Sequence, residues 1–237
     1  MIQEIKSRQN DKIKSLGKIS NKDSLFLVEG FHMLEMALES KLVKEVFTIK
    51  KLDISDDIPQ YIVTNEIMEK ISSMKSPQGV VAVVEKPHCS NEFSDKILYL
   101  DGVSDPGNLG TILRTALAFS YKTVILSSKC CSVYNEKVVQ SSQGSIFKLN
   151  IIENGLEKLL ELKKQKYQVI ATEIKGSISL KNVVPEIKHI LVLGNEAHGV
   201  SDEVLELADL RIRIDIKDIE SLNVGIAGGI AMFELSK

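Results

Sequence analysis

The chain has 237 residues, a formal net charge of −2 and 43% hydrophobic residues. This composition is ordinary for a globular protein of one large domain or two small ones, and the near-neutral charge argues against a protein coated in positive charge. No apolar run reaches about 18 residues, and the N-terminal residues lack the charged segment and apolar core of a secretory signal. We therefore expect a cytoplasmic protein without a membrane span or a secretory signal.

Three cysteines, Cys89, Cys130 and Cys131, are too few and odd in number for a disulfide framework. Cys130 and Cys131 are adjacent, so they lack the two-residue spacer of a zinc or thioredoxin-type pair. We therefore expect free thiols in a reducing cytosol, and no metal site.

The first half of the chain alternates short helical and extended patterns. Apolar residues at helical spacing predict a helix over residues 5–20, and a β-branched run predicts a strand over residues 80–84. Such an alternation predicts an α/β layer structure. The remaining elements expected here are strands at 25–28 and 43–49, a helix that follows Gly30 and runs through Leu38, and a helix at 64–74.

Basic residues are concentrated near the N-terminus. Between residues 6 and 22 a single acidic residue, Asp11, stands against Lys6, Arg8, Lys12, Lys14, Lys18 and Lys22. A local basic stripe attracts phosphates even when the whole chain is near neutral. The alternative is a solvated helix face without a ligand. We take Lys12, Lys14 and Lys18 as the candidate contacts to phosphates.

A polar stretch with one proline, residues 87–91, separates two apolar runs and predicts a linker. We place the domain boundary at residues 86–95. Beyond it the α/β alternation resumes, and the apolar run at 190–193 is typical of a parallel strand buried on both faces. The other strands are expected at 97–100, 123–126, 145–149, 167–171 and 210–214, and the helices at 109–119, 156–164 and 222–235.

The first of three motifs leads from a strand through a glycine-containing loop, residues 101–110, into a helix. Ligands of parallel α/β sheets gather at such strand-to-helix turns, and the free N–H groups of a helix start favour an anion. The interval between Gly102 and Gly107 fits a P-loop, but Asn108-Leu109 stands where that motif has Lys-Ser/Thr. The loop is therefore not expected to bind a nucleoside triphosphate.

Arg114 follows on an otherwise apolar stretch of the same helix. Its planar fork of donors suits phosphate or ribose oxygens. The alternative is a surface arginine on an amphipathic helix.

The second motif, Gly194–Gly199, follows the apolar strand, and Ser201 is a credible N-cap for the next helix. Glu196 is either a solvated loop carboxylate or a site residue. His198 is more simply a loop residue than a catalyst.

The third motif, Glu220–Val224, precedes a helix that contains Gly225, Gly228 and Gly229. Each glycine in a helix interior costs about 1 kcal/mol relative to alanine. Such a loss of helix stability indicates that small residues are needed at these positions. We expect that they allow another backbone to approach the helix closely.

Taken in order, Asp105–Arg114, Gly194–Gly199 and Glu220–Val224 resemble the three motifs of the SpoU (TrmH-type) branch of the SPOUT RNA methyltransferases. Those enzymes transfer a methyl group from S-adenosylmethionine to a ribose 2′-hydroxyl of RNA. The resemblance implies an α/β domain with a mostly parallel sheet and a deep C-terminal trefoil knot, which is a rare exception among chain topologies. It also implies a bent cofactor held in the knot, and a homodimer.

The resemblance assigns the catalytic site to Asn108, Arg114, Glu196, Ser221 and Asn223. Because a guanidinium stays protonated, we expect Arg114 to orient the substrate and stabilise the developing alkoxide, and the general base stays open. Cofactor contacts, largely through backbone groups, are implied at Leu193, Gly194, Ile214, Leu222 and Asn223.

The chain departs from the family pattern in the loop before the third motif. Asp215 stands where a proline is common, and Lys217-Asp218-Ile219 stands where glycines are common. These residues leave the local conformation of a cofactor-facing loop open.

The N-terminal half resembles the family's accessory substrate-binding domain, itself similar to a ribosomal RNA-binding protein. The matching segments are the basic start, Leu25–Gly30 and Pro77–Val84. We therefore expect an RNA substrate-binding domain over residues 1–88 and a SPOUT methyltransferase domain over residues 96–237. Ribosomal RNA is the expected substrate. Transfer RNA is one alternative, and a non-catalytic RNA-binding paralogue is another, against which the intact motif residues argue.

Overall fold

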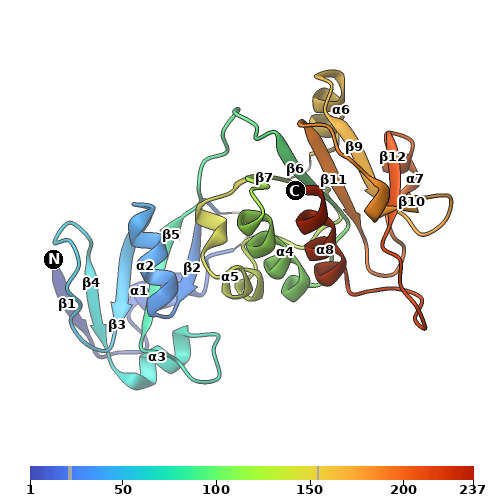
Figure 1. Cartoon of the computed structure of the whole chain (residues 1–237). Helices are drawn as coiled ribbons and strands as arrows, with labels where there is room; N and C mark the ends of the chain where they lie inside the picture. Colours follow the sequence, from blue (N-terminus) through green and yellow to red (C-terminus); the bar gives the residue numbers. More distant parts are fainter. Residues whose placement is uncertain (21–22, 154) are drawn as a thin grey trace. The chain divides into compact units, whose positions relative to one another are not determined.

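The computed structural model describes residues 1–20, 23–153 and 155–237 (Figure 1). Contacts divide the chain into two compact units. The first contains residues 1–87 together with 134–147, and the second contains residues 88–133 and 148–237. No helix in the described ranges is long and apolar enough to cross a membrane.

The first unit is built on a five-stranded mixed sheet with the order β1-β4-β3-β5-β2. β1, β4 and β3 are parallel to one another, whereas β5 is antiparallel to both β3 and β2. The strands are β1 (Ile2–Ile5), β2 (Leu25–Glu29), β3 (Val43–Thr48), β4 (Gln60–Val63) and β5 (Val80–Glu85). The helices are α1 (Asp11–Leu16), α2 (Phe31–Glu39), α3 (Asn65–Ile71) and α5 (Glu136–Ser142).

The predicted helix over residues 5–20 is wrong in its extent. Residues 2–5 instead form β1, which pairs with β4. The helix α1 begins after Asn10, whose side chain accepts a hydrogen bond from the Lys12 N–H, and it ends at Gly17. The basic residues therefore do not share one helix face, and Lys22 lies outside the described residues.

The predicted strand over residues 145–149 is also wrong. Residues Ser145–Phe147 form a 3-10 turn, and the strand β8 (Asn150–Ile152) begins later. Gln143 and Gly144 both have left-handed backbone angles, with φ of 48° and 82°, and this reverses the chain after α5. Phe147 then packs its ring 6.0 Å from that of Phe26. Its apolar side chain thus packs against the first unit, and Phe147 is not part of a strand.

The second unit is built on a seven-stranded sheet with the order β10-β12-β9-β11-β6-β7-β8. Every described strand pair in it is parallel, as the sequence predicts. The strands are β6 (Lys96–Asp101), β7 (Thr123–Leu126), β8, β9 (Gln168–Thr172), β10 (Ile178–Ser179), β11 (His189–Gly194) and β12 (Leu210–Arg213). All six residues of the central strand β11 are buried, as expected for a strand covered on both faces.

Four helices accompany this sheet: α4 (Pro106–Ala118), α6 (Leu156–Lys164), α7 (Asp202–Leu205) and α8 (Val224–Leu235). α4 and α8 lie side by side, and α8 also contacts β11 (Figure 1). This packing carries the third motif, at the start of α8, back to the first motif, at the start of α4.

The glycines of α8 differ in what surrounds them. A Cβ on Gly228 would lie 2.6 Å from Cδ1 of buried Leu193, whereas a Cβ on Gly229 would lie 3.7 Å from Thr115 Cγ2. The first distance is a clash and the second is an ordinary contact. The close approach expected for all three glycines is therefore tight at Gly228 and absent at Gly229.

Gly228→Ala and Gly229→Ala should consequently have opposite effects on the free energy of unfolding. Overpacking against β11 should make Gly228→Ala less stable by about 1–2 kcal/mol. Gly229→Ala should gain up to about 1 kcal/mol from helix propensity. Urea unfolding of both variants beside the wild type measures the difference, and equal stabilisation by both would contradict the packing of α8 on Leu193.

Candidate active site

The first two motifs meet at the carboxyl ends of the adjacent strands β6 and β11, where Asp101 pairs with Gly194. The carboxylate of Asp101 is buried and accepts hydrogen bonds from the N–H of Ser201 at 2.8 Å and from its hydroxyl at 2.6 Å. Ser201 occupies the N-cap position of α7, as predicted, but its side chain makes no capping bond there. Its hydroxyl instead fixes the loop after β11 to the end of β6.

The helix α4 begins earlier than the sequence predicts. Asp105 is its N-cap and accepts a hydrogen bond from the Asn108 N–H at 2.8 Å, and Pro106 occupies the first turn. Proline is well tolerated at this position because its missing N–H would have no partner in the helix. Asn108 therefore lies in the first turn of α4 and not in a loop.

Three of the predicted site residues form a continuous hydrogen-bonded chain. The Asn108 Nδ2 donates to Glu196 Oε1 at 3.0 Å, and the Asn223 Nδ2 donates to Asn108 Oδ1 at 2.9 Å. The Asn223 Oδ1 accepts from the N–H groups of Gly225 and Ile226, at 2.9 and 3.2 Å. The chain Glu196–Asn108–Asn223, here called the amide relay, thus joins one residue from each motif.

The amide relay also fixes which way its two amides point. Only the oxygen of Asn223 can accept from the backbone N–H groups of α8, so its nitrogen faces Asn108. Asn108 must then present its oxygen to Asn223 and its nitrogen to Glu196. The carboxylate of Glu196 is the one acceptor-only group of the relay and stands at its end.

Asn195 is a further connecting residue that the sequence does not single out. Its Nδ2 donates to the Gly102 carbonyl at 2.7 Å, and its Oδ1 accepts from the N–H groups of Ala197 and His198. It thereby shapes the turn that holds Glu196 and ties that turn to the first motif. The position of Asn195 directly after Gly194 could have marked it as a site residue. Its hydrogen-bond partner, Gly102, is about 90 residues away in sequence, and a local sequence pattern cannot predict such a contact.

Gly194 is a position that accepts no other residue. A Cβ there would lie 2.1 Å from the Gly199 carbonyl carbon and 2.2 Å from the Val200 nitrogen. The loop after β11 folds back on the strand end, with Asn195 and Gly199 exchanging backbone hydrogen bonds of 2.8 and 2.9 Å. Glycine is thus required at the strand end because the backbone of Gly199 and Val200 fills the space that a side chain would need.

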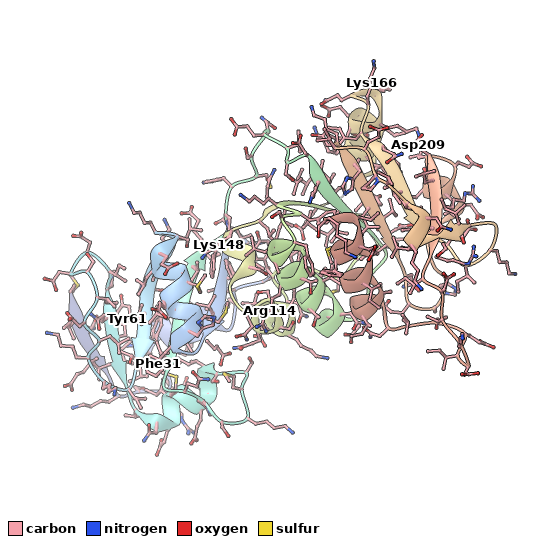
Figure 2. The ribbon with its side chains drawn as sticks, viewed as in Figure 1. Phe31, Tyr61, Arg114, Lys148, Lys166 and Asp209 are labelled. Carbon is pink, nitrogen blue, oxygen red and sulfur yellow. The ribbon has the colours of Figure 1, made fainter. Side chains whose placement is uncertain are left out.

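Arg114 and Ser221 are not joined to the amide relay. Both side chains are exposed, and neither has a hydrogen-bond or ion-pair partner within the described residues. Figure 2 shows Arg114 projecting from α4. Its guanidinium is therefore available to a ligand outside the chain.

The loop of residues 214–222 offers backbone groups rather than side chains. Asp215 anchors its start by accepting from the Ser179 hydroxyl at 2.5 Å and pairing with Arg213 at 3.4 Å. Asp218 adopts a left-handed φ of 63° without glycine, which aspartate tolerates better than most residues. From residue 216 to 222 no backbone N–H or C=O is paired within the described part of the chain.

The candidate RNA contacts near the N-terminus differ in their availability. Lys12 pairs with Glu45 at 2.5 Å, and the hydrogen bond to Glu45 raises the pKa of Lys12. Lys14 lies 3.8 Å from Asp11, whereas Lys18 is exposed and has no ion-pair partner among the described residues. Lys18 is thus the most available cation of the three.

The free cysteines do not form a ligand cluster. Cys130 donates its thiol to the Leu100 carbonyl at 3.2 Å, and burial raises the pKa of the Cys131 thiol to about 11. No group of three or more His, Cys, Asp or Glu side chains in the described ranges is arranged to hold a metal ion.

A seven-stranded parallel sheet with a polar relay across two neighbouring strand ends defines an α/β enzyme of the class that binds its ligand outside the carboxyl ends of the strands. The model of the SpoU rRNA Methylase family matches residues 95–233, and that of an MRM3-like substrate binding domain matches residues 10–82. The chain belongs to the SpoU rRNA methylase family.

Known proteins resemble most or nearly all of the chain. The 23S rRNA (guanosine(2553)-2′-O)-methyltransferase RlmP of Bacillus subtilis is 30% identical over 99% of both chains. The tRNA (guanosine(18)-2′-O)-methyltransferase of Aquifex aeolicus is 31% identical over 72% of this chain and 80% of its own. The AdoMet-bound rRNA methyltransferase structure from Sinorhizobium meliloti superposes with a TM-score of 0.87, at 26% identity, over 99% of this chain and 97% of that one.

The chain is accordingly an S-adenosylmethionine-dependent RNA ribose 2′-O-methyltransferase with an N-terminal substrate-binding domain. The bound cofactor supplies an electrophilic methyl group. The residues present fit such a group, because the unpaired backbone groups of residues 216–222 can accept and donate hydrogen bonds without competing partners within the described residues.

Proposed function

We propose that the enzyme methylates ribosomal RNA in the cytoplasm. The match of the full chain, both domains included, to an enzyme named for 23S rRNA supports ribosomal RNA, whereas the match to the transfer RNA enzyme leaves out more of the chain. The experiment is to map 2′-O-methylated riboses in total RNA from a deletion strain. One lost site in ribosomal RNA is expected, and loss only in transfer RNA would establish the alternative substrate.

We propose that the amide relay, Arg114 and Ser221 form the catalytic site. The single observation that carries this assignment is the relay itself, which draws one side chain from each motif into one hydrogen-bonded unit. The relay positions Glu196, while the free guanidinium of Arg114 engages the target ribose or its phosphate. Charge that develops on the 2′-oxygen is then stabilised by a donor already in place.

The cofactor is proposed to lie against Leu193, Gly194, Ile214, Leu222 and Asn223. The supporting observation is that these residues lie at the end of β11, at the start of α8 and in the loop between β12 and α8, whose backbone groups from residue 216 to 222 are unpaired within the described residues. We further propose that α8 reaches its place beside α4 through a deep trefoil knot. The return of the chain from β12, near one edge of the sheet, to α4 and β11 supports that path.

The domain from residue 1 to about 88 is proposed to bind the RNA substrate through Lys12, Lys14 and Lys18, and residues 96–237 are proposed to carry the methyltransferase site. The match of residues 10–82 to a substrate-binding domain supports this division.

Replacing Lys12, Lys14 and Lys18 with glutamine should weaken RNA binding and reduce its salt dependence, because each phosphate contact releases counterions. Substituting the exposed Lys164, Lys166 and Lys181 of the second unit provides the charge-matched control. Filter binding over a range of salt concentrations measures both. A salt slope that falls equally in the two triple variants would assign RNA binding to another surface.

We propose that the enzyme is a homodimer assembled through α8. Its outward face carries Ile226, Ile230 and Phe233, exposed by 56%, 40% and 51% respectively. Their spacing of four and three residues places them on one face of the helix. A second copy is the proposed occupant because this face begins beside the amide relay, where Asn223 caps the helix.

Ile230→Lys should therefore convert the protein to a monomer in sedimentation velocity, since a charge would enter an apolar interface. Ile187→Lys, at an exposed apolar residue remote in sequence from α8, should leave the dimer intact. A wild-type protein that sediments as a monomer at micromolar concentration would overturn the proposal.

A further inference from the structure

A polar cavity of about 90 Å³ opens at the carboxyl ends of β6 and β7, on the other side of Gly102 from the amide relay. Its lining includes Tyr99, Ser128, Lys129 and Glu203, with Leu156 and Val204 as apolar walls. Because about 10–15 Å³ of such space holds one water, the cavity has room for several waters or for the edge of one planar ring.

Tyr99 supplies a polar group to the cavity that has no partner within the described residues. The residue is only 1% exposed, lines the cavity, and its hydroxyl has no hydrogen-bond partner in the described part of the chain. Burial, and then the charge of Asp101, raises the pKa of Tyr99, so the hydroxyl remains a donor.

Lys129 and Glu203 are also unpaired. Both side chains are exposed, and neither forms an ion pair or a hydrogen bond within the described residues. The remaining carboxylate, that of Asp101, is already satisfied by Ser201. The cavity thus presents donors from Tyr99, Ser128 and Lys129 beside one free carboxylate.

This charge pattern distinguishes between the parts of an RNA substrate. A phosphate would meet two carboxylates against one ammonium and is disfavoured. A base with a carbonyl oxygen next to an imino N–H matches the pattern, because the carbonyl accepts from the donors and the N–H donates to the carboxylate. Guanine and uracil have this arrangement, and adenine and cytosine do not.

The cavity adjoins the amide relay through Gly102. A Cβ built on Gly102 would lie 3.6 Å from both Lys129 Cβ and Asn195 Cβ. The Gly102 N–H donates to Ser127 Oγ at 3.0 Å, and its carbonyl accepts from Asn195. Gly102 thus lies between Lys129, in the cavity wall, and Asn195, whose side chain shapes the turn that holds Glu196.

We propose that this cavity receives the base of the target nucleotide and selects guanine or uracil over adenine and cytosine, with Glu203 accepting from the imino N–H and Tyr99 and Lys129 donating to the carbonyl oxygen. The proposal rests on the methyltransferase function above and adds its base specificity. The imino N–H and the carbonyl oxygen lie on the Watson–Crick edge of the base, and RNA-binding proteins commonly recognise unstacked bases by hydrogen bonds to that edge.

The test uses the full chain and ribosomal RNA extracted from a deletion strain. The wild type should methylate a guanosine or a uridine. Glu203→Gln should lower kcat/KM by roughly tenfold or more, the effect of losing one good base contact, and Tyr99→Phe should do the same while keeping the ring. Glu206→Gln, an exposed neighbour that does not line the cavity, is the control. Methylation of adenosine or cytidine by the wild type would overturn the base assignment and leave the methyltransferase function standing.

A second arm does not depend on turnover. GMP, UMP, AMP and CMP are titrated into the full chain saturated with S-adenosylhomocysteine, which keeps the nucleotides out of the cofactor site. GMP and UMP should bind more tightly than AMP and CMP, and Glu203→Gln should remove the difference. Equal binding of the four nucleotides by the wild type would contradict the proposal even if no RNA substrate is methylated.

Discussion

Asn108→Asp should reduce the rate of methyl transfer by about a hundredfold or more, the typical loss when one preorganised donor of an active site is removed. The substitution keeps the size of the side chain and its acceptor for Asn223. It replaces the donor that faces Glu196, 3.0 Å away, with a carboxylate oxygen. Two facing carboxylates repel each other, so the turn that carries Glu196 should move away from α4.

Asn135→Asp is the matched control, since aspartate caps a helix as well as asparagine does and this side chain caps α5 by accepting from Lys137. Single-turnover methylation with saturating RNA and S-adenosylmethionine measures the effect. Because the relay is largely exposed, thermal unfolding should shift little. A rate near that of the wild type would remove the amide relay from the mechanism.

Arg114→Ala should lower kcat and kcat/KM together, also by about a hundredfold or more, because the lost interaction forms as charge builds on the ribose oxygen. Arg114→Lys should lose most of the activity as well, since the planar fork is absent. The affinity for S-adenosylmethionine, measured by calorimetry, should stay near that of the wild type. The Arg114 side chain is exposed and forms no hydrogen bond or ion pair within the described residues, so the variants should fold normally.

Lys122→Ala removes another exposed cation just beyond the end of α4 and serves as the control. Near-normal methylation by folded Arg114→Ala would exclude the arginine and leave Glu196, Ser221 and Asn223 as the candidates.

The regular elements of the second unit could be predicted from sequence because their signals are local. The strand at 123–126 and the helix at 156–164 match the structure residue for residue, since a short apolar run and a clear helical period each admit one reading. β4 was missed because it is a four-residue strand that depends on pairing with β1 and β3. α5 was missed because its polar residues carry little apolar period, and its packing belongs to the first unit.

The composition of the candidate site could be predicted, but its connections could not. Motif residues such as Asn108, Glu196 and Asn223 stand out by resemblance. That they share one hydrogen-bonded relay depends on α8 lying against α4, which no local pattern encodes. The same holds for Tyr99, which reads as an ordinary strand residue and is distinguished only by the cavity that it lines.

The most direct test is in vitro methylation of ribosomal RNA from a deletion strain, followed by mapping of the modified nucleotide. With wild-type protein and S-adenosylmethionine, a single ribose should become 2′-O-methylated, and Asn108→Asp protein should leave the same ribose unmodified. Methylation of a base, or equal ribose methylation by the wild type and the variant, would contradict a ribose methyltransferase that acts through the amide relay.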